Sequence, residues 1–420
     1  MNTAASAPAR LRALDVFRGA TVALMILVNN PGSWNALYPP LAHAPWHGCT
    51  PTDLVFPFFL FAVGNALAIV MPGLQAAGPA VFWRRVLQRT LLIFAIGLLL
   101  NASPFVRWDP GSGELVLRSW ETLRTMGVLQ RIALCFGAAA VTVWLMRSFG
   151  RHGALWATAV LLVGYFLVCE LAGAAGAPYS LQGWFGTAID QSLLGSAHLY
   201  KGEGVPFDPE GLASTAPAVA QVLLGWWVGR MVVDAVQAGA VNAQLLARLF
   251  LWASLLLVLA YLWQLQMPLN KKIWTSSYVL HTTGLAMMAL ALCLRALEPG
   301  LGAASLPGRQ GAVPAVLRTA VQGTARFFEV FGRNPLFIFV LSGLIPRVLA
   351  LLRWPAGVGE QGQTLWTSPL PWLYQNLFAP AGAAFTTDPR LGSLLYAVAH
   401  LLPYAALAWW LDRRRVYLRV

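Results

Sequence analysis

Residues 52–72 read TDLVFPFFLFAVGNALAIVMP and contain one charged side chain, that of Asp53. About 20 apolar residues in a helix are enough to cross the hydrocarbon core of a bilayer. A segment of this length and composition therefore predicts a transmembrane helix rather than the buried helix of a water-soluble protein.

Further apolar segments extend this pattern along the chain. We expect spans near Phe17–Trp34, Thr52–Pro72, Gln88–Asn101, Met126–Met146, Leu155–Leu171, Thr215–Val233, Leu249–Gln266, Tyr278–Leu294, Phe327–Leu352 and Leu391–Leu411. The stretch Trp366–Phe378 is an eleventh candidate, either re-entrant or interfacial. The 420 residues are 58% hydrophobic and 11% charged, whereas soluble domains carry about 25% charged residues. We predict an all-α polytopic membrane protein of about 10–11 transmembrane helices, forming one domain over residues 1–420.

Arginine is concentrated in alternate loops, which sets the expected orientation. The positive-inside rule predicts that both termini are cytoplasmic. The outer loops would then be Asn35–Pro51, Ala102–Thr125, Ala172–Ser214, Met267–Ser277 and Arg353–Arg390. Lys271, Lys272 and the mixed charges of the second outer loop break this pattern, so they are candidates for function. The net charge of +13 follows from the arginines of the cytoplasmic loops. Since they form no single basic patch, no nucleic-acid partner is expected.

Several other classes of protein lack support in the sequence. The four cysteines are scattered and no pair has metal-ligand spacing, so neither a metal nor a disulfide framework is predicted. No cleavable signal peptide is predicted, because Asp15 and Arg18 lead directly into the first apolar run. No internal repeat is recognisable, which disfavours an inverted-repeat transporter. There is also no serine nucleophile elbow, phosphate loop or dinucleotide fingerprint.

The first span is polar at both ends. Asp15 and Arg18 precede its apolar part, and Asn29 and Asn30 end it. At 3.6 residues per turn, Arg18 and Asn29 fall on nearly the same face of the helix. Taken singly, they are explained by an arginine that reaches toward the membrane surface and an asparagine at a helix end. Together they indicate a polar stripe, as expected of a helix that borders a cavity.

Two of the six histidines lie close together in the first outer loop. His43 and His47 are on either side of Trp46, and Asp53 opens the next apolar run. Imidazole permits proton transfer near neutral pH, and a nearby carboxylate can orient it. Asp53 is equally placed to cap the helix that follows. The pattern makes His43 and Asp53 a candidate base and its partner, while a loop histidine without a catalytic role is the alternative.

The ninth span contains Arg333 and Asn334, followed by Pro335. Proline lacks the backbone N–H that continues a helix, so we expect the helix to break there. Backbone groups freed by such a break are tolerated only against protein or water. The ninth span is therefore predicted to line a cavity, with a simple kink as the alternative.

Seven sequence blocks resemble, in the same order, the heparan-α-glucosaminide N-acetyltransferase family and its bacterial relatives. They are LRALDVFRGATVALMILVNN, HAPWHGCTPTDLVFPFFLFAVGNAL, TMGVLQRIALCF, LLGSAHLY, FDPEGLASTAPAVAQVLLGWWVGR, NKKIWTSSYVL and GRNPLFIFVLSG. The blocks extend from about Leu11 to Leu344, and DLVFP and FDPEG are the most specific. The opening block also distantly resembles the wider membrane acyltransferases that begin with an R-A-x-D-x-x-R-G helix.

The resemblance implies a reaction and a location. An acetyl group from cytosolic acetyl-CoA would pass to an amino sugar on the outer side of a bacterial inner membrane, and the enzyme would form homodimers. The active histidine of the family falls in H-A-x-W-x-G, which corresponds to His43. The family asparagine after the first span corresponds to Asn29. His47 stands where the eukaryotic member has another residue, and the stretch between Asn29 and His43 is longer here.

In this interpretation each candidate residue receives a role. His43 is the base or itself accepts the acetyl group, Asn29 holds the oxyanion or orients substrate, and Asp53 orients the histidine. Cations and helix ends suit the phosphates of CoA, and aromatic rings can stack on adenine or sugar. The candidates for CoA binding are Arg18, Arg131, Lys271, Lys272, Trp274, Arg333 and Asn334. The candidates for acceptor binding are Trp46, His47, His198 and Asp208.

Three other functions are compatible with the sequence. An O-acyltransferase would use the same scaffold with a hydroxyl acceptor. A transporter of a sugar or acyl carrier would explain the polar stripe and the broken ninth span. A catalytically silent scaffold is disfavoured because Asn29 and His43 are both present. The acetyltransferase is our main hypothesis because of the ordered blocks and the outward position of His43.

Overall fold

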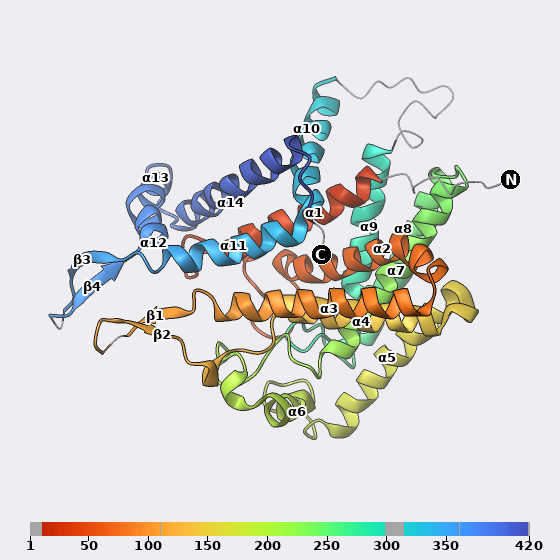
Figure 1. Ribbon diagram of the computed structural model, residues 1–420, viewed down its shortest axis with the longest axis horizontal. Coiled ribbons are helices and arrows are strands. Elements are labelled where there is room, and N and C mark those ends of the chain that lie inside the picture. Colours follow the sequence, from red (N-terminus) through yellow and green to blue (C-terminus); the bar gives the residue numbers. More distant parts are fainter. Residues whose placement is uncertain (1–10, 110, 299–314, 361, 419–420) are drawn as a thin grey trace.

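The computed structural model describes residues 11–109, 111–298, 315–360 and 362–418 (Figure 1). Helices dominate these residues. They are α1 (Arg12–Asn29), α2 (Val55–Ala76), α3 (Pro79–Ala102), α4 (Val128–Leu145), α5 (Gly150–Ala172), α6 (Phe185–Leu194), α7 (Thr215–Gln237), α8 (Ala243–Trp263), α9 (Ser276–Leu297), α10 (Ala315–Arg333), α11 (Pro335–Leu349), α12 (Pro369–Leu373), α13 (Ala379–Ala383) and α14 (Arg390–Arg413). Two antiparallel hairpins pair β1 (Val106–Trp108) with β2 (Leu115–Leu117) and β3 (Trp354–Val358) with β4 (Thr364–Thr367).

Within the described residues, eight helices are long and apolar enough to cross a membrane, or nine if α10 and α11 form one broken span. This confirms the all-α polytopic fold. The count is lower than predicted partly because α1, at the first predicted span, is a single 18-residue helix carrying Arg12, Asp15 and Arg18. The eleventh candidate comprises the end of β4, the five-residue α12 and a five-residue π-helical segment, which leads directly into the five-residue α13. This helical stretch is too short to span a membrane, and the re-entrant or interfacial assignment stays a prediction.

The ninth predicted span breaks where Pro335 predicts it. α10 and α11 differ in direction by 82° across the break. Asn334 lies between them and is fully buried. Its side chain donates to Val416 O at 3.0 Å and accepts from Leu418 N at 2.7 Å. The segment that follows α14 therefore satisfies polar groups at the break, as backbone irregularities within a membrane require.

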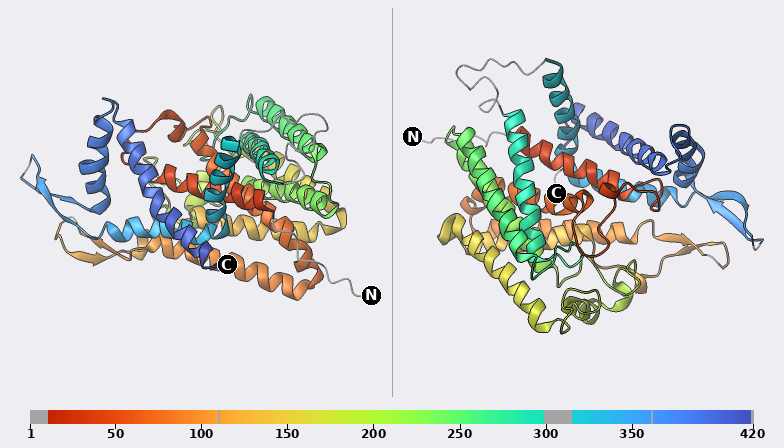
Figure 2. Two further views of the ribbon diagram at one scale, coloured as in Figure 1. Left: turned by 90° about the horizontal axis from the view of Figure 1, so that it is seen from above. Right: turned by 180° about the vertical axis from the view of Figure 1, so that it is seen from behind.

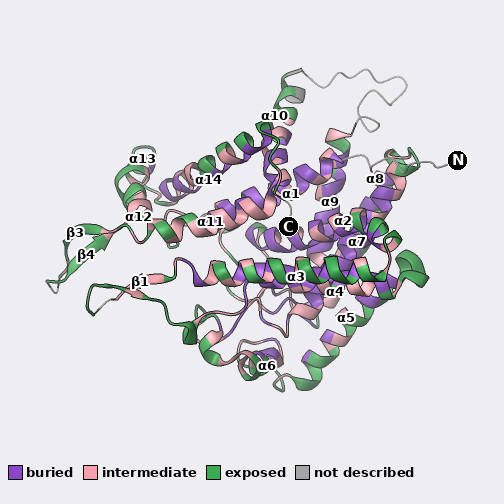
Figure 3. Cartoon of the chain, viewed as in Figure 1, coloured by how far each residue is buried: buried purple, intermediate pink, exposed green. Residues whose placement is uncertain are grey.

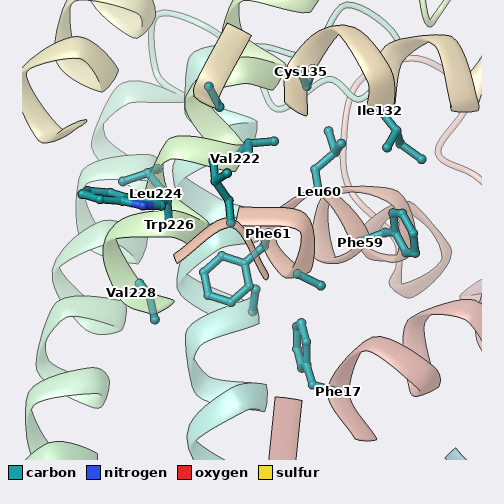
Figure 4. Close-up of a cluster of buried hydrophobic side chains, with 14 of the residues drawn as sticks. Phe17, Phe59, Leu60, Phe61, Ile132, Cys135, Val222, Leu224, Trp226 and Val228 are labelled. Atoms are coloured by element: carbon teal, nitrogen blue, oxygen red, sulfur yellow. The ribbon is translucent and has the colours of Figure 1, made fainter. Parts of the chain in front are cut away.

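The centre of the bundle is the pair formed by α2 and α7, which are buried along most of their length (Figure 3). Two glycines permit this close crossing. A Cβ at Gly64 would lie 2.1 Å from Val222 O, and a Cβ at Gly225 would lie 2.3 Å from Phe61 O. Small residues at such crossings let helix backbones approach in membrane bundles. The side chains around the crossing form the apolar cluster of Figure 4.

The outside of the bundle is apolar. α8 lies at the edge of the bundle in both further views, and α3 lies along the lower edge in the left view (Figure 2). Leu91 and Leu92 of α3 and Leu262 of α8 are exposed, as are many other large apolar side chains. An apolar surface of this extent fits hydrocarbon rather than water as its surroundings.

Three connecting segments meet at the end of the bundle where α1 stops. The α1–α2 loop contacts the α8–α9 turn, where Gly48 N donates to Leu269 O at 2.7 Å. It also contacts the long segment after α5, where Trp46 Nε1 donates to Tyr179 O at 2.8 Å. These bonds bring residues far apart in the sequence around His43.

Candidate active site

His43 and Asp53 form the centre of the site. His43 Nδ1 lies 2.6 Å from Asp53 Oδ1. An ionised carboxylate can only accept a hydrogen bond, so this contact places the imidazole proton on Nδ1 and makes Nε2 the accepting nitrogen. The histidine side chain is 39% exposed, whereas that of Asp53 is 1% exposed. A reachable imidazole backed by a buried carboxylate can act as a base.

Asp53 is held in place through its second oxygen. Oδ2 accepts from Ala44 N, Thr50 N and Thr50 Oγ1, each at 3.0 Å. Asp53 and Thr50 also form a reciprocal capping box at the start of the helical segment that leads into α2. The predicted alternatives of helix cap and histidine partner are thus combined, since one oxygen caps the helix and the other contacts His43.

The α8–α9 turn brings Lys271 against this pair. Lys271 Nζ lies 3.1 Å from His43 Nδ1, 3.5 Å from His43 Nε2 and 3.5 Å from Asp53 Oδ1. Trp274 ends the turn with a φ of 54°. This value costs free energy for a bulky residue and persists only where packing enforces it. Its ring is buried, with Phe56 edge-on at 5.2 Å and the Arg131 guanidinium 5.3 Å away. Packing of Trp274 therefore fixes the position of Lys271.

Burial also shapes the titration of the loop residues. It lowers the pKa of Lys271, and the Asp53 carboxylate partly opposes that shift. Burial raises the pKa of the Cys49 thiol to about 12, and the Asp53 carboxylate adds to this. Since the thiolate is the nucleophilic form, Cys49 is poorly suited to attack a thioester. Among the neighbouring groups, His43 is the better candidate for the chemistry.

A cavity of about 280 Å³ opens beside His43 and is here named the His43 cavity. Lys272 borders it and bonds Glu203 Oε2 at 2.6 Å and Pro45 O at 2.8 Å. Its ammonium also lies 5.6 Å from the centre of the Trp46 ring. The lining residues are His43, Ala44, Trp46, Asp53, Arg124, Val128, Tyr200, Glu203, Pro209, Glu210, Lys271, Lys272 and Trp274.

Asn29 lines a different cavity of about 340 Å³, here named the Asn29 cavity. Arg124 and Val128 border both cavities, so the two adjoin. Arg124 is held by Asp208, at 2.8 and 2.6 Å, and by Glu210, at 2.6 Å. The predicted asparagine and histidine are therefore on two sides of the Arg124 side chain rather than in one cavity.

Other predicted ligands surround these cavities without lining them. Arg131 is fully buried and bonds Gly211 O and Ser214 Oγ. His47 Nδ1 lies 3.4 Å from Asn270 Nδ2, and burial lowers the pKa of this histidine. His198 Nδ1 lies 2.8 Å from Leu123 O. Together with Asp208, which holds Arg124, these residues support the walls of the site.

Three predicted CoA ligands lie at the opposite end of α1. Arg18 bonds Asp15 and Gly332 O. Arg333 bonds Glu329 and Asp412, and Asn334 fastens the break described above. Eleven positions along a helix correspond to about 16 Å, so Arg18 is remote from Asn29. The structure does not bring these three residues to the His43 cavity.

Residues that we did not assign to the site also line the His43 cavity. Arg124, Tyr200, Glu203 and Glu210 come from the second and third outer loops. The second outer loop has mixed charges that break the positive-inside pattern. This was the feature of the sequence that could have indicated Arg124. Among the described residues, no group of three or more histidine, cysteine or acidic side chains is arranged to hold a metal ion.

The sequence of the chain is similar to those of two known proteins. The chain is 27% identical over 332 residues to heparan-alpha-glucosaminide N-acetyltransferase of Homo sapiens, covering 67% of this chain and 48% of that protein. It is 26% identical over 342 residues to the protein of the same name from Mus musculus, covering 69% and 50%. The family resemblance is confirmed. The chain spans about half the length of these relatives, and no protein-family profile matches it.

Proposed function

We propose that the chain is a membrane acetyltransferase that moves an acetyl group from acetyl-CoA to an amino sugar on the outer side of the cytoplasmic membrane. The observation that carries the proposal is the 2.6 Å contact between His43 Nδ1 and Asp53 Oδ1 at the edge of a cavity. Both relatives are named as N-acetyltransferases, which supports the reaction class. The loop assignment from the positive-inside rule supports the side.

The proposed step needs a base and then an acid at one position. The acceptor nitrogen forms a bond with the acetyl carbonyl carbon, and His43 Nε2 takes the proton that this nitrogen loses. The bond from that carbon to sulfur then breaks, and His43 returns the proton to the departing sulfur. Asp53 keeps the imidazole in the required tautomer and stabilises the imidazolium between the two transfers.

Negative charge develops on the acetyl oxygen during this step. Lys271 lies beside the imidazole, with Nζ 3.5 Å from Nε2, so its ammonium is placed to stabilise that charge. Arg124 lines the same cavity. A positioned cation or hydrogen-bond donor at an oxyanion contributes about 2.7–4 kcal/mol in acyl transfer. Asn29 lines the adjoining cavity on the other side of Arg124. It is therefore better placed to bind the acetyl donor than to stabilise this oxygen.

Purified protein in detergent, incubated with radiolabelled acetyl-CoA and a panel of amino sugars and matched hydroxyl acceptors, tests the proposal. We expect the wild type to acetylate an amino sugar and His43→Ala to lose about 10²-fold or more of that rate. His152→Ala is the control, because His152 is exposed at the start of α5 and lies outside the site.

The outcomes separate the alternatives. Label that stays on wild-type protein without acceptor, and is absent from His43→Ala, would identify an acetyl-histidine intermediate. Acetylation of the hydroxyl acceptors alone would show that the acceptor group is a hydroxyl and that the protein is an O-acyltransferase. Equal rates in the wild type and His43→Ala would overturn the role of His43. Binding of neither acetyl-CoA nor any acceptor would overturn the proposed reaction, and sugar counterflow in proteoliposomes would then test the transport alternative.

A further inference from the structure

A cavity of about 520 Å³, larger than either cavity of the candidate active site, adjoins them. It lies between the last turn of α3, strand β1 and the end of α11. Among the residues that the structure describes, four arginines line it and no acidic side chain does; they are Arg107, Arg118, Arg124 and Arg347. We name it the arginine basin.

Two of these arginines hold charges that the protein does not neutralise. Arg118 donates to Asn101 O at 3.2 Å and to Ser103 O at 2.9 Å. Arg347 reaches from α11 to bond Leu100 O and Ser103 Oγ. Neither forms an ion pair with a carboxylate among the residues that the structure describes. The bonds to carbonyl and hydroxyl oxygens orient both guanidinium groups and leave both positive charges in place.

Both guanidinium groups bond Ser103, Arg118 at its carbonyl oxygen and Arg347 at its hydroxyl, so two positive charges lie close together. Arg124 is compensated by Asp208 and Glu210, whereas the partners of Arg118 and Arg347 among the described residues are neutral. Like charges held close together repel each other, and a bound anion offsets that repulsion.

The basin is continuous with the site of the proposed reaction. Arg124 lines the basin, the Asn29 cavity and the His43 cavity, so the three adjoin at this side chain. Two hairpins project beside the basin (Figure 1). Arg353 joins them, since its guanidinium lies 3.8 Å from the Trp108 ring centre and 4.3 Å from that of Trp366. This frame holds Trp108, which also lines the basin.

We propose that the arginine basin binds a phosphate group carried by the acceptor, so that the preferred substrate is a phosphorylated amino sugar. This inference rests on the proposed function, because it names the class of acceptor that the acetyltransferase would use. The phosphate would lie between Arg118 and Arg347, and the amino group of the same molecule would extend past Arg124 toward His43.

Charge and geometry favour phosphate over a singly charged group. A phosphate monoester carries about −1.5 to −2 charges near pH 7 and offers three acceptor oxygens. Two uncompensated guanidinium groups supply two positive charges and forked donors that match those oxygens. A carboxylate or sulfate would neutralise one of the two charges. The acceptor is favoured over CoA as the source because the basin is formed by loops predicted to face outward, whereas acetyl-CoA is expected from the cytoplasm.

Steady-state acetylation of glucosamine, glucosamine 6-sulfate, glucosamine 6-phosphate and glucosamine 1-phosphate tests the proposal. For the wild type we expect kcat/KM to be at least about tenfold higher for one of the phosphates than for glucosamine, with the sulfate in between. In Arg118→Gln that preference should fall by about tenfold. Arg347→Lys keeps a charge but loses the forked donors, so it should lose part of the preference. Arg390→Gln is the matched control, because Arg390 pairs with Asp388 in another predicted outer loop.

Each outcome has a separate meaning. Acetylation of glucosamine with no preference for phosphate would overturn the basin proposal and leave the proposed function standing. Equal preference for sulfate and phosphate would overturn the assignment of a doubly charged group. If Arg118→Gln raised KM for acetyl-CoA, but not for acetyl-pantetheine, the phosphate would belong to the donor and the acceptor proposal would fail. No acetylation of any sugar would be a failure of the proposed function itself.

Discussion

The two ends of α1 carry charged clusters of opposite design. At the end where α1 begins, Arg326 and Arg333 share Asp412 and also pair with Glu329, which Arg12 bonds at 3.0 Å. At the other end, Lys271 shares one buried carboxylate with His43, and no acidic residue in the described part of the chain lines the arginine basin. We call these the paired cluster and the open cluster.

The difference separates two uses of arginine in a membrane bundle. In the paired cluster nearly every guanidinium meets a carboxylate, and the bonds join α1, α10 and α14. Such a network fastens helices at a broken span and leaves little capacity for a ligand. In the open cluster, Arg118 and Arg347 border a cavity and bond neutral oxygens, whereas Lys271 and Arg124 contact carboxylates. An arginine is therefore a better candidate for ligand binding when its charge lacks a partner than when it merely lies within a span.

The largest expected effect is that of Asp53→Asn on activity. Asp53 Oδ2 accepts three hydrogen bonds from Ala44 and Thr50, so the carbonyl oxygen of the new amide should take that position and its NH2 should face His43. The amide would then donate to Nδ1 and move the imidazole proton to Nε2, where the base is needed. We expect kcat to fall by about 10³-fold. Because Asp53 is buried and also pairs with Lys271, the midpoint of thermal unfolding should fall as well, so kcat is measured on protein that remains folded. A kcat near that of the wild type in the folded variant would show that Asp53 acts only as a helix cap.

A smaller effect, on stability rather than on turnover, is expected in the paired cluster. Asp412→Asn removes a carboxylate that is 2% exposed and serves both Arg326 and Arg333. Breaking a buried ion pair from one side costs about 3 kcal/mol, so the midpoint of thermal unfolding should fall by roughly 5 °C.

Two comparisons sharpen that prediction. Asp388→Asn removes a carboxylate from a more exposed pair with Arg390 and should cost under about 1 kcal/mol. Asp412→Asn protein that remains folded should keep its acetylation rate within about twofold. A variant as stable as the wild type, but without affinity for acetyl-CoA, would assign the paired cluster to ligand binding and remove the distinction between the two clusters.

The contrast also explains how far the sequence could predict this molecule. Apolar runs located nearly every helix, because about 20 apolar residues have few alternatives to a membrane span. Pro335 located the break between α10 and α11, because its missing N–H is a local property. The proximity of His43 and Asp53 was predictable because ten residues separate them within one loop.

Long-range pairing was not predictable from one sequence. Arg333 and Lys271 were equal candidates for phosphate binding, because what distinguishes them is a carboxylate 79 residues away for one and a histidine 228 residues away for the other. Arg124 was not assigned to the site for the same reason, since Asp208 and Glu210 position it from another loop. Contacts of this kind depend on how helices pack, which the pattern of apolar residues leaves open.

The smallest expected effect concerns the pH dependence of turnover. It tests whether the positive charge of Lys271 in the open cluster contributes to turnover. Burial lowers the pKa of Lys271 below its ordinary value of 10.5, so the ammonium loses its proton at a lower pH than an exposed lysine would. If that ammonium stabilises the oxyanion, kcat should decline on the alkaline side as pH rises through the lowered pKa. We expect about tenfold rather than the full contribution of an oxyanion donor, because Arg124 lines the same cavity and stays charged. Lys271→Met should be slower at neutral pH and lack this decline. Lys271→Arg stays charged over the accessible range, so its decline should move to higher pH. An alkaline decline that persists unchanged in Lys271→Met would mean that another group causes it, and Lys271 would then serve only to hold Asp53 and the turn that ends at Trp274.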